Sequence, residues 1–143
     1  MKKYTRICAR IDLDAIEYNL EMMRRRLPSD TKMIGVIKMD GYGHGAAQIA
    51  KYVMEEKDYI WGYAAATPDE AALLRKKGIQ KPILVLGCTF PEQRDEMIRQ
   101  EIRMTCYTEE MARDVSERAG RLGKTAYIHI KLDTGMSRLG FLI

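Results

Sequence analysis

The sequence predicts an α/β protein built around a parallel β-sheet. Along its 143 residues, short apolar runs alternate with stretches that have the periodicity of amphipathic helices. The apolar runs are continuous, as expected for strands buried on both faces, and the connections to the helices are short. Two architectures fit this pattern. One is a doubly wound open sheet, and the other is a (β/α)8 barrel, which normally needs about 200 residues or more.

The first predicted elements are a strand and a helix. Residues 7–13 (ICARIDL) alternate between apolar and polar side chains, which predicts a strand. Asp14 is placed to cap a helix over residues 15–27, because its carboxylate can accept the free amides of the first turn. Pro28 ends this helix. Its predicted apolar face consists of Ile16, Leu20, Met23 and Leu27.

The rest of the chain repeats the strand–helix unit. Thr67 and Glu70 occupy the capping and third positions of a helix start, with a proline between them. Thr108 caps a later helix, and Gly123 closes it. The further strands are predicted at residues 32–38, 59–65, 83–87, 103–106 and 126–131. The further helices are predicted at residues 46–57, 68–77, 91–101 and 109–121.

Composition excludes several classes of protein. With 46% apolar and 31% charged residues, the chain has the composition of a globular protein, so disorder is not expected. No apolar run approaches the roughly 18 residues of a membrane span. The N-terminus MKKYTRICARIDLD lacks the apolar core of a signal peptide. We therefore expect a cytoplasmic protein without a membrane partner.

The cysteines and histidines predict neither a disulfide framework nor a metal centre. Cys8, Cys88 and Cys106 are odd in number and far apart, which suits reduced, mostly buried thiols. His44 and His129 are the only histidines, too few for a histidine-built metal site. The net charge of +4 comes from basic residues interspersed with acidic ones, so nucleic-acid binding is not predicted.

Lys38 is the first candidate functional residue, because it ends an apolar strand. In parallel folds, ligands collect at the carboxyl ends of the strands. Partial desolvation there favours the neutral, nucleophilic form of an amine, which can bond to an aldehyde cofactor. The alternative is a rim lysine that extends into water and has no role.

The glycine-rich turn that follows has two possible uses. Gly41, Gly43 and Gly45 let the backbone approach a ligand closely, and amides that open a helix attract phosphate. Gly41, Gly43 and Ala46 also match the dinucleotide-binding pattern G-x-G-x-x-G/A. The acidic partner of that pattern should end the second strand, whereas the candidate Asp58 precedes it. The dinucleotide interpretation therefore fails on context.

Two residues of the turn have both a functional and a structural interpretation, and a third residue has only a structural one. Tyr42 and His44 are either polar ligand contacts or turn residues, and the structural role is favoured for His44. His129 lies inside a strand and is interpreted as a packed residue.

A second group of charged residues follows the last predicted strand. Lys131 and Arg138 place two cations near the rim, and Asp133 can pair with either of them. Two cations suit a carboxylate or phosphate ligand, to which the guanidinium offers a bidentate fork. The alternative is an ion-pair network that fixes the loop.

Two segments resemble hallmark motifs of bacterial alanine racemases. VIKMDGYGHG is similar to their cofactor-lysine segment V-V-K-A-x-A-Y-G-H-G, and HIKLDTGMSRLGF is similar to H-x-K-x-D-T-G-M-x-R-L-G. ARIDLDAIEYNL and TPDEAALLRKKGIQKPILVLG also fit the family's pattern, so the resemblance covers essentially the whole chain. The departures are small: Met39 and Gly41 stand where alanine is commoner, and Ser137 occupies a variable position.

The resemblance implies a fold-type III pyridoxal 5'-phosphate enzyme that interconverts L-alanine and D-alanine for cell-wall synthesis. Its fold would be an α/β parallel (β/α) barrel of TIM type, incomplete here, with about five to six β/α units. Lys38 would bind the cofactor covalently and act as the base on the D-alanine side. Tyr42 would contact the cofactor phosphate. Arg138 would meet the substrate carboxylate and the phenolic oxygen of the cofactor.

Three further residues would support this site. Lys131 matches a lysine that is carbamylated in many members of the family, where it positions the arginine. Asp133 and His44 belong to the same two motifs and are expected to hold the loops in place.

The resemblance also implies a domain organisation. Residues 1–143 would be the N-terminal portion of a pyridoxal-phosphate-binding barrel, with the C-terminal β domain absent. In the family, a tyrosine from that later domain reaches in from the partner subunit as the second base. We therefore expect the chain alone to be inactive or nearly so, and to form homo-oligomers. The alternatives are a non-catalytic cofactor-binding or structural piece, and a racemase that acts on serine or a broader range of amino acids.

Overall fold

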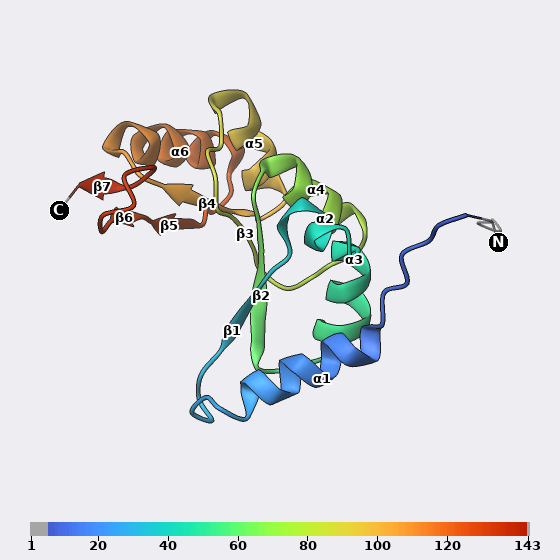
Figure 1. The fold of residues 1–143 in the computed structure, drawn as a ribbon. Helices are drawn as coiled ribbons and strands as arrows, with labels where there is room; N and C mark the ends of the chain where they lie inside the picture. Colours follow the sequence, from blue (N-terminus) through green and yellow to red (C-terminus); the bar gives the residue numbers. More distant parts are fainter. Residues whose placement is uncertain (1–5, 143) are drawn as a thin grey trace.

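A five-stranded parallel sheet organises the chain (Figure 1). The computed structural model describes residues 6–142, so residues 1–5 and 143 of the predicted domain lie outside the described part. The strand order is β1-β2-β3-β4-β5. These strands are β1 (Met33–Val36), β2 (Ile60–Ala65), β3 (Ile83–Val85), β4 (Arg103–Cys106) and β5 (Ile128–Ile130). A separate parallel pair is formed by β6 (Leu132–Asp133) and β7 (Phe141–Leu142).

Helices connect the successive strands of the sheet. The first helix precedes β1, and the others follow one strand and lead to the next (Figure 1). They are α1 (Leu13–Arg24), α2 (Lys38–Tyr42), α3 (Ala46–Ile49), the π-helical turn η1 (Ala50–Met54), α4 (Pro68–Lys76), α5 (Pro91–Arg99) and α6 (Glu109–Leu122).

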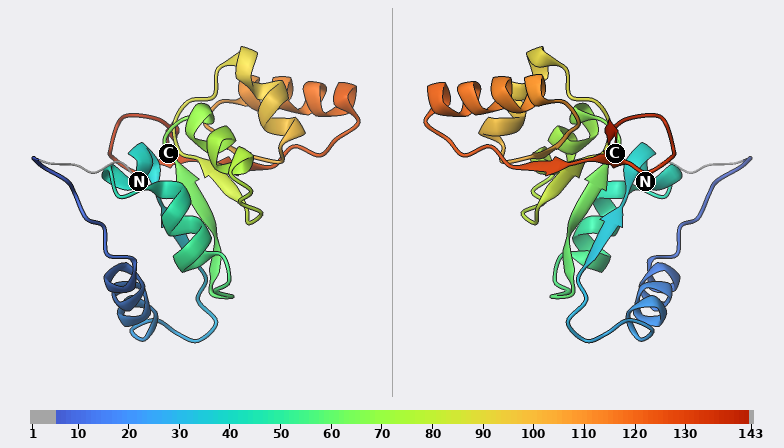
Figure 2. Two further views of the ribbon diagram at one scale, coloured as in Figure 1. Left: turned by 90° about the vertical axis from the view of Figure 1, so that its right-hand side faces the viewer. Right: turned by 90° about the vertical axis from the view of Figure 1, so that its left-hand side faces the viewer.

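The strand order decides between the two predicted architectures. Each strand pairs with the next one in the sequence, so every crossover advances in the same direction. Because such crossovers are right-handed, the helices all come to lie on one face of the sheet. Figure 2 shows α3 to α6 on one side of the strands, with the other side of the sheet bare. A doubly wound sheet reverses its order and has helices on both faces, so this architecture is excluded.

The core lies between the sheet and this layer of helices. Its largest fully buried side chains come from the strands, from the loops that precede them and from α5. They include Tyr63, Ile60, Ile79, Ile83, Ile98, Ile102 and Met104. The opposite face of β1 is uncovered, with Ile34 41% and Val36 56% exposed.

The helix after the glycine turn is shorter than predicted and ends in a π-helical turn. The amide of Glu55 donates to the carbonyl of Ala50 at 2.8 Å, one residue further back than in an α-helix. The Tyr63 hydroxyl donates to the Glu55 carboxylate at 2.8 Å and lies 3.2 Å from the carbonyl oxygen of Ala50. The π turn also packs Met54 against Gly35, where a Cβ would be 2.8 Å from the methionine sulfur. The sequence predicts an α-helix over residues 46–57. The structure instead has an α-helix only to Ile49, followed by a π-helical turn that ends at Met54.

The N-terminal prediction is wrong in two respects. Residues 7–12 form neither strand nor helix, and Ile7 is 89% exposed. A strand needs a neighbour to accept its hydrogen bonds, and none of the described strands pairs with this segment. The helix begins at Leu13 and is capped by Asp12, not Asp14, because the Asp12 carboxylate accepts the Ala15 amide at 3.0 Å. Of its predicted apolar face, only Leu20 is fully buried.

The other helix caps are confirmed. The Thr67 hydroxyl accepts the amide of Glu70 at 3.3 Å, and the Thr108 hydroxyl accepts the amide of Met111 at 3.1 Å. Gly123 ends α6 with a φ of 61°, the left-handed conformation that glycine adopts without strain. β4 has the predicted bounds, whereas the last predicted strand, residues 126–131, is limited to β5.

The cysteines are free thiols, as predicted, but not all are buried. Cys106 is buried, Cys88 is half-buried and Cys8 is exposed, because it lies in the segment that forms no strand. Within residues 6–142, no group of histidine, cysteine and carboxylate side chains is arranged to hold a metal ion. Over the same residues, no helix combines the length and apolarity needed to cross a bilayer.

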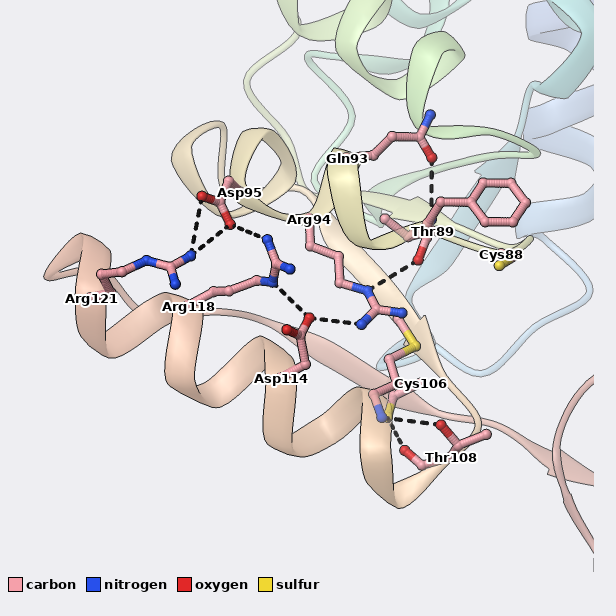
Figure 3. A network of polar contacts seen from close by, with 12 residues as sticks. Cys88, Thr89, Gln93, Arg94, Asp95, Cys106, Thr108, Asp114, Arg118 and Arg121 are labelled. Carbon is pink, nitrogen blue, oxygen red and sulfur yellow. Dashed lines mark hydrogen bonds and ion pairs between the residues drawn. The ribbon is translucent and has the colours of Figure 1, made fainter.

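An ion-pair network joins α5 to α6 (Figure 3). Arg118 donates to Asp95 at 2.8 Å and to Asp114 at 2.7 Å, and Arg94 also donates to Asp114 at 2.7 Å. Arg121 approaches Asp95 at 3.5 Å. The Arg118 guanidinium lowers the pKa of both carboxyl groups below their usual range. The network therefore stabilises the helix pair only while the two aspartates are ionised.

The stability of the chain is expected to fall in acid through this network. A lowered folded-state pKa gives a contribution that is present above the unfolded value of about 3.9 and is lost as pH falls through the folded value. Chemical unfolding measured between about pH 6 and pH 2 should show less of this acid loss in Arg118→Met than in the wild type. Arg113→Met is the matched control on α6, because its ion pair with Glu109 is exposed. Equal acid loss in Arg118→Met and the wild type would contradict the assignment.

Candidate active site at the carboxyl ends of the strands

Lys38 lies at the carboxyl end of β1. The strand ends two residues earlier than predicted, at Val36, but the amide of Ile37 still donates to the carbonyl of Ala64 on β2 at 3.0 Å. Ile37 is 4% exposed, so its side chain anchors the strand end in the core, and Lys38 beside it is half-buried. The sheet therefore holds the backbone of Lys38 at the rim, as predicted.

The five residues that follow Lys38, residues 39–43, all have a positive φ. This conformation costs a non-glycine residue roughly 1–2 kcal/mol, so other contacts must stabilise it. The amide of Gly41 donates to the carbonyl of Ile37 at 3.0 Å, and the Asp40 carboxylate accepts the amide of Ala46 at 2.8 Å, which joins the turn to α3. The φ angles are 54° at Met39, 53° at Asp40, 62° at Gly41 and 55° at Tyr42.

Glu70 contacts the same turn from the first turn of α4. Its Oε1 accepts the amide of Met39 at 3.0 Å, and its Oε2 accepts the amide of Ala66 at 2.7 Å. In a capping box the glutamate carboxylate returns to the amide of its own cap residue, whereas here both oxygens accept amides outside the helix. The sequence indicates only a helix start at Thr67 to Glu70, so this tertiary contact was missed.

Tyr42 and His44 are exposed residues of the turn, and Tyr42 lies beside Lys38. The Lys38 ammonium nitrogen is 5.8 Å from the centre of the Tyr42 ring. Tyr42 itself is 70% exposed. His44 Nδ1 donates to the carbonyl of Gly41 at 2.9 Å, so this side chain stabilises the turn, as the favoured interpretation predicts.

The loop after β5 is held by Asp133, but not through an ion pair. Asp133 Oδ1 accepts the amides of Gly135 at 2.9 Å and Ser137 at 3.0 Å. The Ser137 and Gly135 amides lower the pKa of this carboxyl group. None of the ion pairs within residues 6–142 includes Asp133, Lys131 or Arg138. The ion-pair network, one of the two alternatives for this loop, is therefore not formed by these residues, because the local amides satisfy the Asp133 carboxylate.

Two adjoining cavities bring the predicted cations together. A cavity of about 270 Å³ is lined by both Lys38 and Arg138, which lie far apart in the sequence. A second cavity of about 360 Å³ is lined by Lys131 and again by Arg138. Leu86, just beyond β3, lines both. No carboxylate is among the described residues that line either cavity, so the site offers three unpaired cations to an anionic ligand.

The other predicted residues are not on the Lys38 cavity wall. Tyr42, His44 and Asp133 are absent from the lining of both cavities, within the part of the chain that the structure describes. His129 is more than a packed residue, because it lines the Lys131 cavity. Burial, with Arg103 nearby, lowers the pKa of this imidazole and favours its neutral form.

A larger cavity, of about 420 Å³, lies behind the left-handed turn, between α3 and α4. Its walls include Asp40 and Glu70, but Lys38 and Arg138 do not reach it. The residue types needed for chemistry therefore gather at the smaller cavities, at the carboxyl ends of the strands, where parallel folds place their active sites.

Comparison with known proteins identifies close relatives. The family model for the N-terminal domain of alanine racemase matches residues 11–143. Alanine racemase 1 of Clostridium acetobutylicum is 44% identical over 136 residues, which are 95% of this chain and 34% of that protein. A solved alanine racemase structure from Clostridium difficile 630 is 42% identical with a TM-score of 0.88, and the match covers 92% of this chain and 34% of that one.

A relative with another substrate in its name shares the fold. A histidine racemase from Leuconostoc mesenteroides subsp. sake is 27% identical, with a TM-score of 0.79 over 91% of this chain and 34% of that protein. This chain spans about a third of the length of the curated relatives that it matches.

These findings confirm the fold that the resemblance implies. The singly wound parallel sheet is part of a TIM-type (β/α) barrel, and both lysine motifs of the rim fall within the residues that the family model matches. On the evidence of this match, the chain belongs to the alanine racemase family.

Proposed function

We propose that the chain forms the lysine-bearing part of a pyridoxal 5'-phosphate-dependent racemase that interconverts L-alanine and D-alanine. The observation that carries this proposal is the meeting of Lys38 and Arg138 in one cavity at the carboxyl ends of the strands. The names of the relatives support alanine as the substrate.

The residues at the rim fit this cofactor. Pyridoxal 5'-phosphate carries an aldehyde, a phosphate and a phenolic oxygen, so it needs one amine and several cationic or hydrogen-bonding groups. Lys38 supplies the amine, and Arg138 supplies a guanidinium on the same wall. Tyr42 is the proposed phosphate contact, since its exposed ring lies beside Lys38. The absence of a carboxylate from the lining residues suits the negative charge of the cofactor.

When bound, the cofactor withdraws electrons from the amino-acid Cα and makes its proton acidic. Lys38 would hold the cofactor through its amine, and the same amine would take or return the Cα proton on one face. Arg138 binds the substrate carboxylate, which fixes the Cα next to that amine. Lys131 lines the adjoining cavity with Arg138, and once carbamylated, as the family resemblance implies, it would offer a carboxylate that orients the Arg138 guanidinium.

Racemisation needs a second base on the opposite face of the Cα. We propose that this base comes from outside these 143 residues, which would form the N-terminal portion of the barrel. The chain alone is then expected to give no measurable L-to-D turnover of alanine. Turnover by the pure chain would contradict this part of the proposal.

Covalent attachment of the cofactor tests the site directly. Pyridoxal phosphate is added to the chain, the visible spectrum is recorded, the adduct is reduced with borohydride, and the labelled peptide is identified by mass spectrometry. The proposal predicts that Lys38 is the preferred position. Label spread evenly over the exposed lysines would favour the alternative of a purely structural piece.

Substrate preference requires a complete enzyme. Residues 11–143 can replace the matching segment of the Clostridium acetobutylicum relative, and the chimaera can be assayed with L-alanine, L-serine and L-histidine. Preference for alanine would support the proposal. A preference for serine or histidine that the parent enzyme lacks would favour a broader amino-acid racemase, for which the similarity to a histidine racemase is the specific observation.

We also propose that the chain associates with a second copy. Apolar side chains are exposed at both edges of the sheet, with Val36 56% exposed on β1 and Ile130 69% exposed on β5. Light scattering at moderate concentration should give a mass above that of the monomer, and Val36→Lys or Ile130→Lys should reduce it. Leu73→Lys is the matched control, since Leu73 is exposed on α4 away from both edges. A monomer in the wild type would contradict the proposal.

A further inference from the structure

Glu70 joins the ends of two adjacent strands. One carboxylate oxygen accepts the amide of Met39, the residue after Lys38, and the other accepts the amide of Ala66, just beyond β2. Ala66 lines the cavity that Lys38 and Arg138 share. Glu70 is half-buried, and both contacts are charge-assisted, so each is stronger than a hydrogen bond between neutral groups.

The contact with Met39 fixes the peptide unit that follows Lys38. Met39 has a φ of 54° and a ψ of 43°, a conformation that an unbranched side chain rarely adopts without support. Among the described hydrogen bonds of the turn, the amides of Gly41 and Gly45 donate to nearby backbone carbonyls, whereas the amide of Met39 donates to the Glu70 side chain. The Glu70 carboxylate therefore serves as the hydrogen-bond acceptor for the Met39 amide, the first amide of the left-handed turn.

Helix capping does not account for this carboxylate. The Thr67 hydroxyl already caps α4 by accepting the amide of Glu70. A negative charge in the first turn also favours the helix through its dipole, but the exposed Asp69 supplies such a charge equally well. What distinguishes Glu70 from Asp69 is the pair of amides at the strand ends.

We propose that Glu70 is a positioning residue that directs the Lys38 amine into the cavity shared with Arg138, by fixing the Lys38–Met39 peptide against the end of β2. This inference rests on the proposed function of Lys38. It assigns to α4 a part in the site, although no atom of Glu70 lies on the wall of that cavity.

The variant Glu70→Gln tests the proposal, with Asp69→Asn as its matched control. The amide of glutamine has one oxygen, so it can accept only one of the two backbone amides. The rate of borohydride trapping of pyridoxal phosphate at Lys38 is measured against cofactor concentration, with Lys51 in the same molecules as an internal reference. We expect Glu70→Gln to lower the limiting rate at Lys38 by about tenfold or more, with little change in the half-saturating concentration. Asp69→Asn should stay within about twofold of the wild type.

The outcomes separate the two proposals. Equal limiting rates at Lys38 in Glu70→Gln and Asp69→Asn would overturn the role of Glu70 and leave the function of Lys38 intact. Failure of the wild type to label Lys38 in preference to Lys51 would overturn the proposed function. A fall at Lys51 as large as that at Lys38 would mean general destabilisation and would also overturn the positioning role.

Hydrogen exchange supplies a measurement that needs no variant to fold. In the wild-type chain the amides of Met39 and Ala66 should exchange slowly, at rates close to those of the flanking strands. An amide of Met39 that exchanges as fast as the exposed loop after β5 would overturn the proposal. In Glu70→Gln, protection of at least one of the two amides should be lost, while Asp69→Asn should retain both.

Discussion

Lys38→Ala is expected to abolish site-specific binding of pyridoxal phosphate. The variant removes the only amine among the residues that line the cavity shared with Arg138. Surface lysines still react weakly and reversibly, but none of those in residues 6–142 lines this cavity, where Arg138 can bind the anionic groups of the cofactor. The visible absorption band of the mixture should therefore fall to the background given by those lysines, and reductive trapping should yield no preferred peptide.

Lys51→Ala is the matched control for this experiment. The Lys51 ammonium nitrogen lies 5.7 Å from the ring of Tyr52, much as that of Lys38 lies 5.8 Å from the ring of Tyr42. Lys51 is on η1, away from the strand ends, and is exposed. It thus shares the local amine–tyrosine pair but not the cavity. An unchanged spectrum in Lys38→Ala, or an equal loss in Lys51→Ala, would refute the assignment.

The elements that the sequence predicts well are those with local causes. Thr67 and Thr108 mark helix starts because a hydroxyl must accept free amides there, and this requirement does not depend on the rest of the fold. β4 is a short segment between two helices, and the cap of the second helix at Thr108 limits where the strand can end. The meeting of Lys38 and Arg138 follows from the rule that ligands collect at strand ends, together with the family resemblance.

The wrong predictions share a different cause. Residues 7–13 have the alternation of a strand, yet a strand also needs a partner, which no local pattern specifies. Asp133 was considered able to pair with a cation, but its carboxylate instead accepts the amides of Gly135 and Ser137, which are close along the chain. In both places, a local pattern left open which partner would satisfy the polar groups.

The left-handed turn after Lys38 shows the limit of local reasoning most clearly. Met39 has no preference for a positive φ, and the modest preference of Asp40 does not predict a run of such residues. The conformation depends on Glu70, which lies on another helix, and on Asp40 reaching the start of α3. From the sequence alone, Glu70 is assigned to the start of the helix, because this local role already explains a glutamate at that position. The structure adds a second role, the contact of Glu70 with the amides of Met39 and Ala66, which depends on how α4 packs against the strand ends.

Gly62→Ala is expected to destabilise the fold more than an ordinary small-to-large substitution. Gly62 lies within β2, and a Cβ there would be 2.4 Å from the carbonyl oxygen of Pro82. The same oxygen accepts the amide of Tyr63 at 2.8 Å, the first bond between β2 and β3. Relief of the clash must move this carbonyl and weaken that bond. Overpacking costs about 1–3 kcal/mol, and a buried amide without a partner adds about 1–3 kcal/mol.

Gly120→Ala is the matched control, because the same methyl group should have the opposite effect there. Gly120 is an exposed glycine within α6, and a Cβ would meet no atom within 4 Å. Alanine in a helix is favoured over glycine by about 0.5–1 kcal/mol, partly through the unfolded chain. That unfolded-state gain is also present at Gly62, so a loss there must come from the native structure. Urea unfolding of the two variants should therefore move the midpoint in opposite directions, and a Gly62→Ala chain as stable as the wild type would show that β2 and β3 do not pack as closely as described.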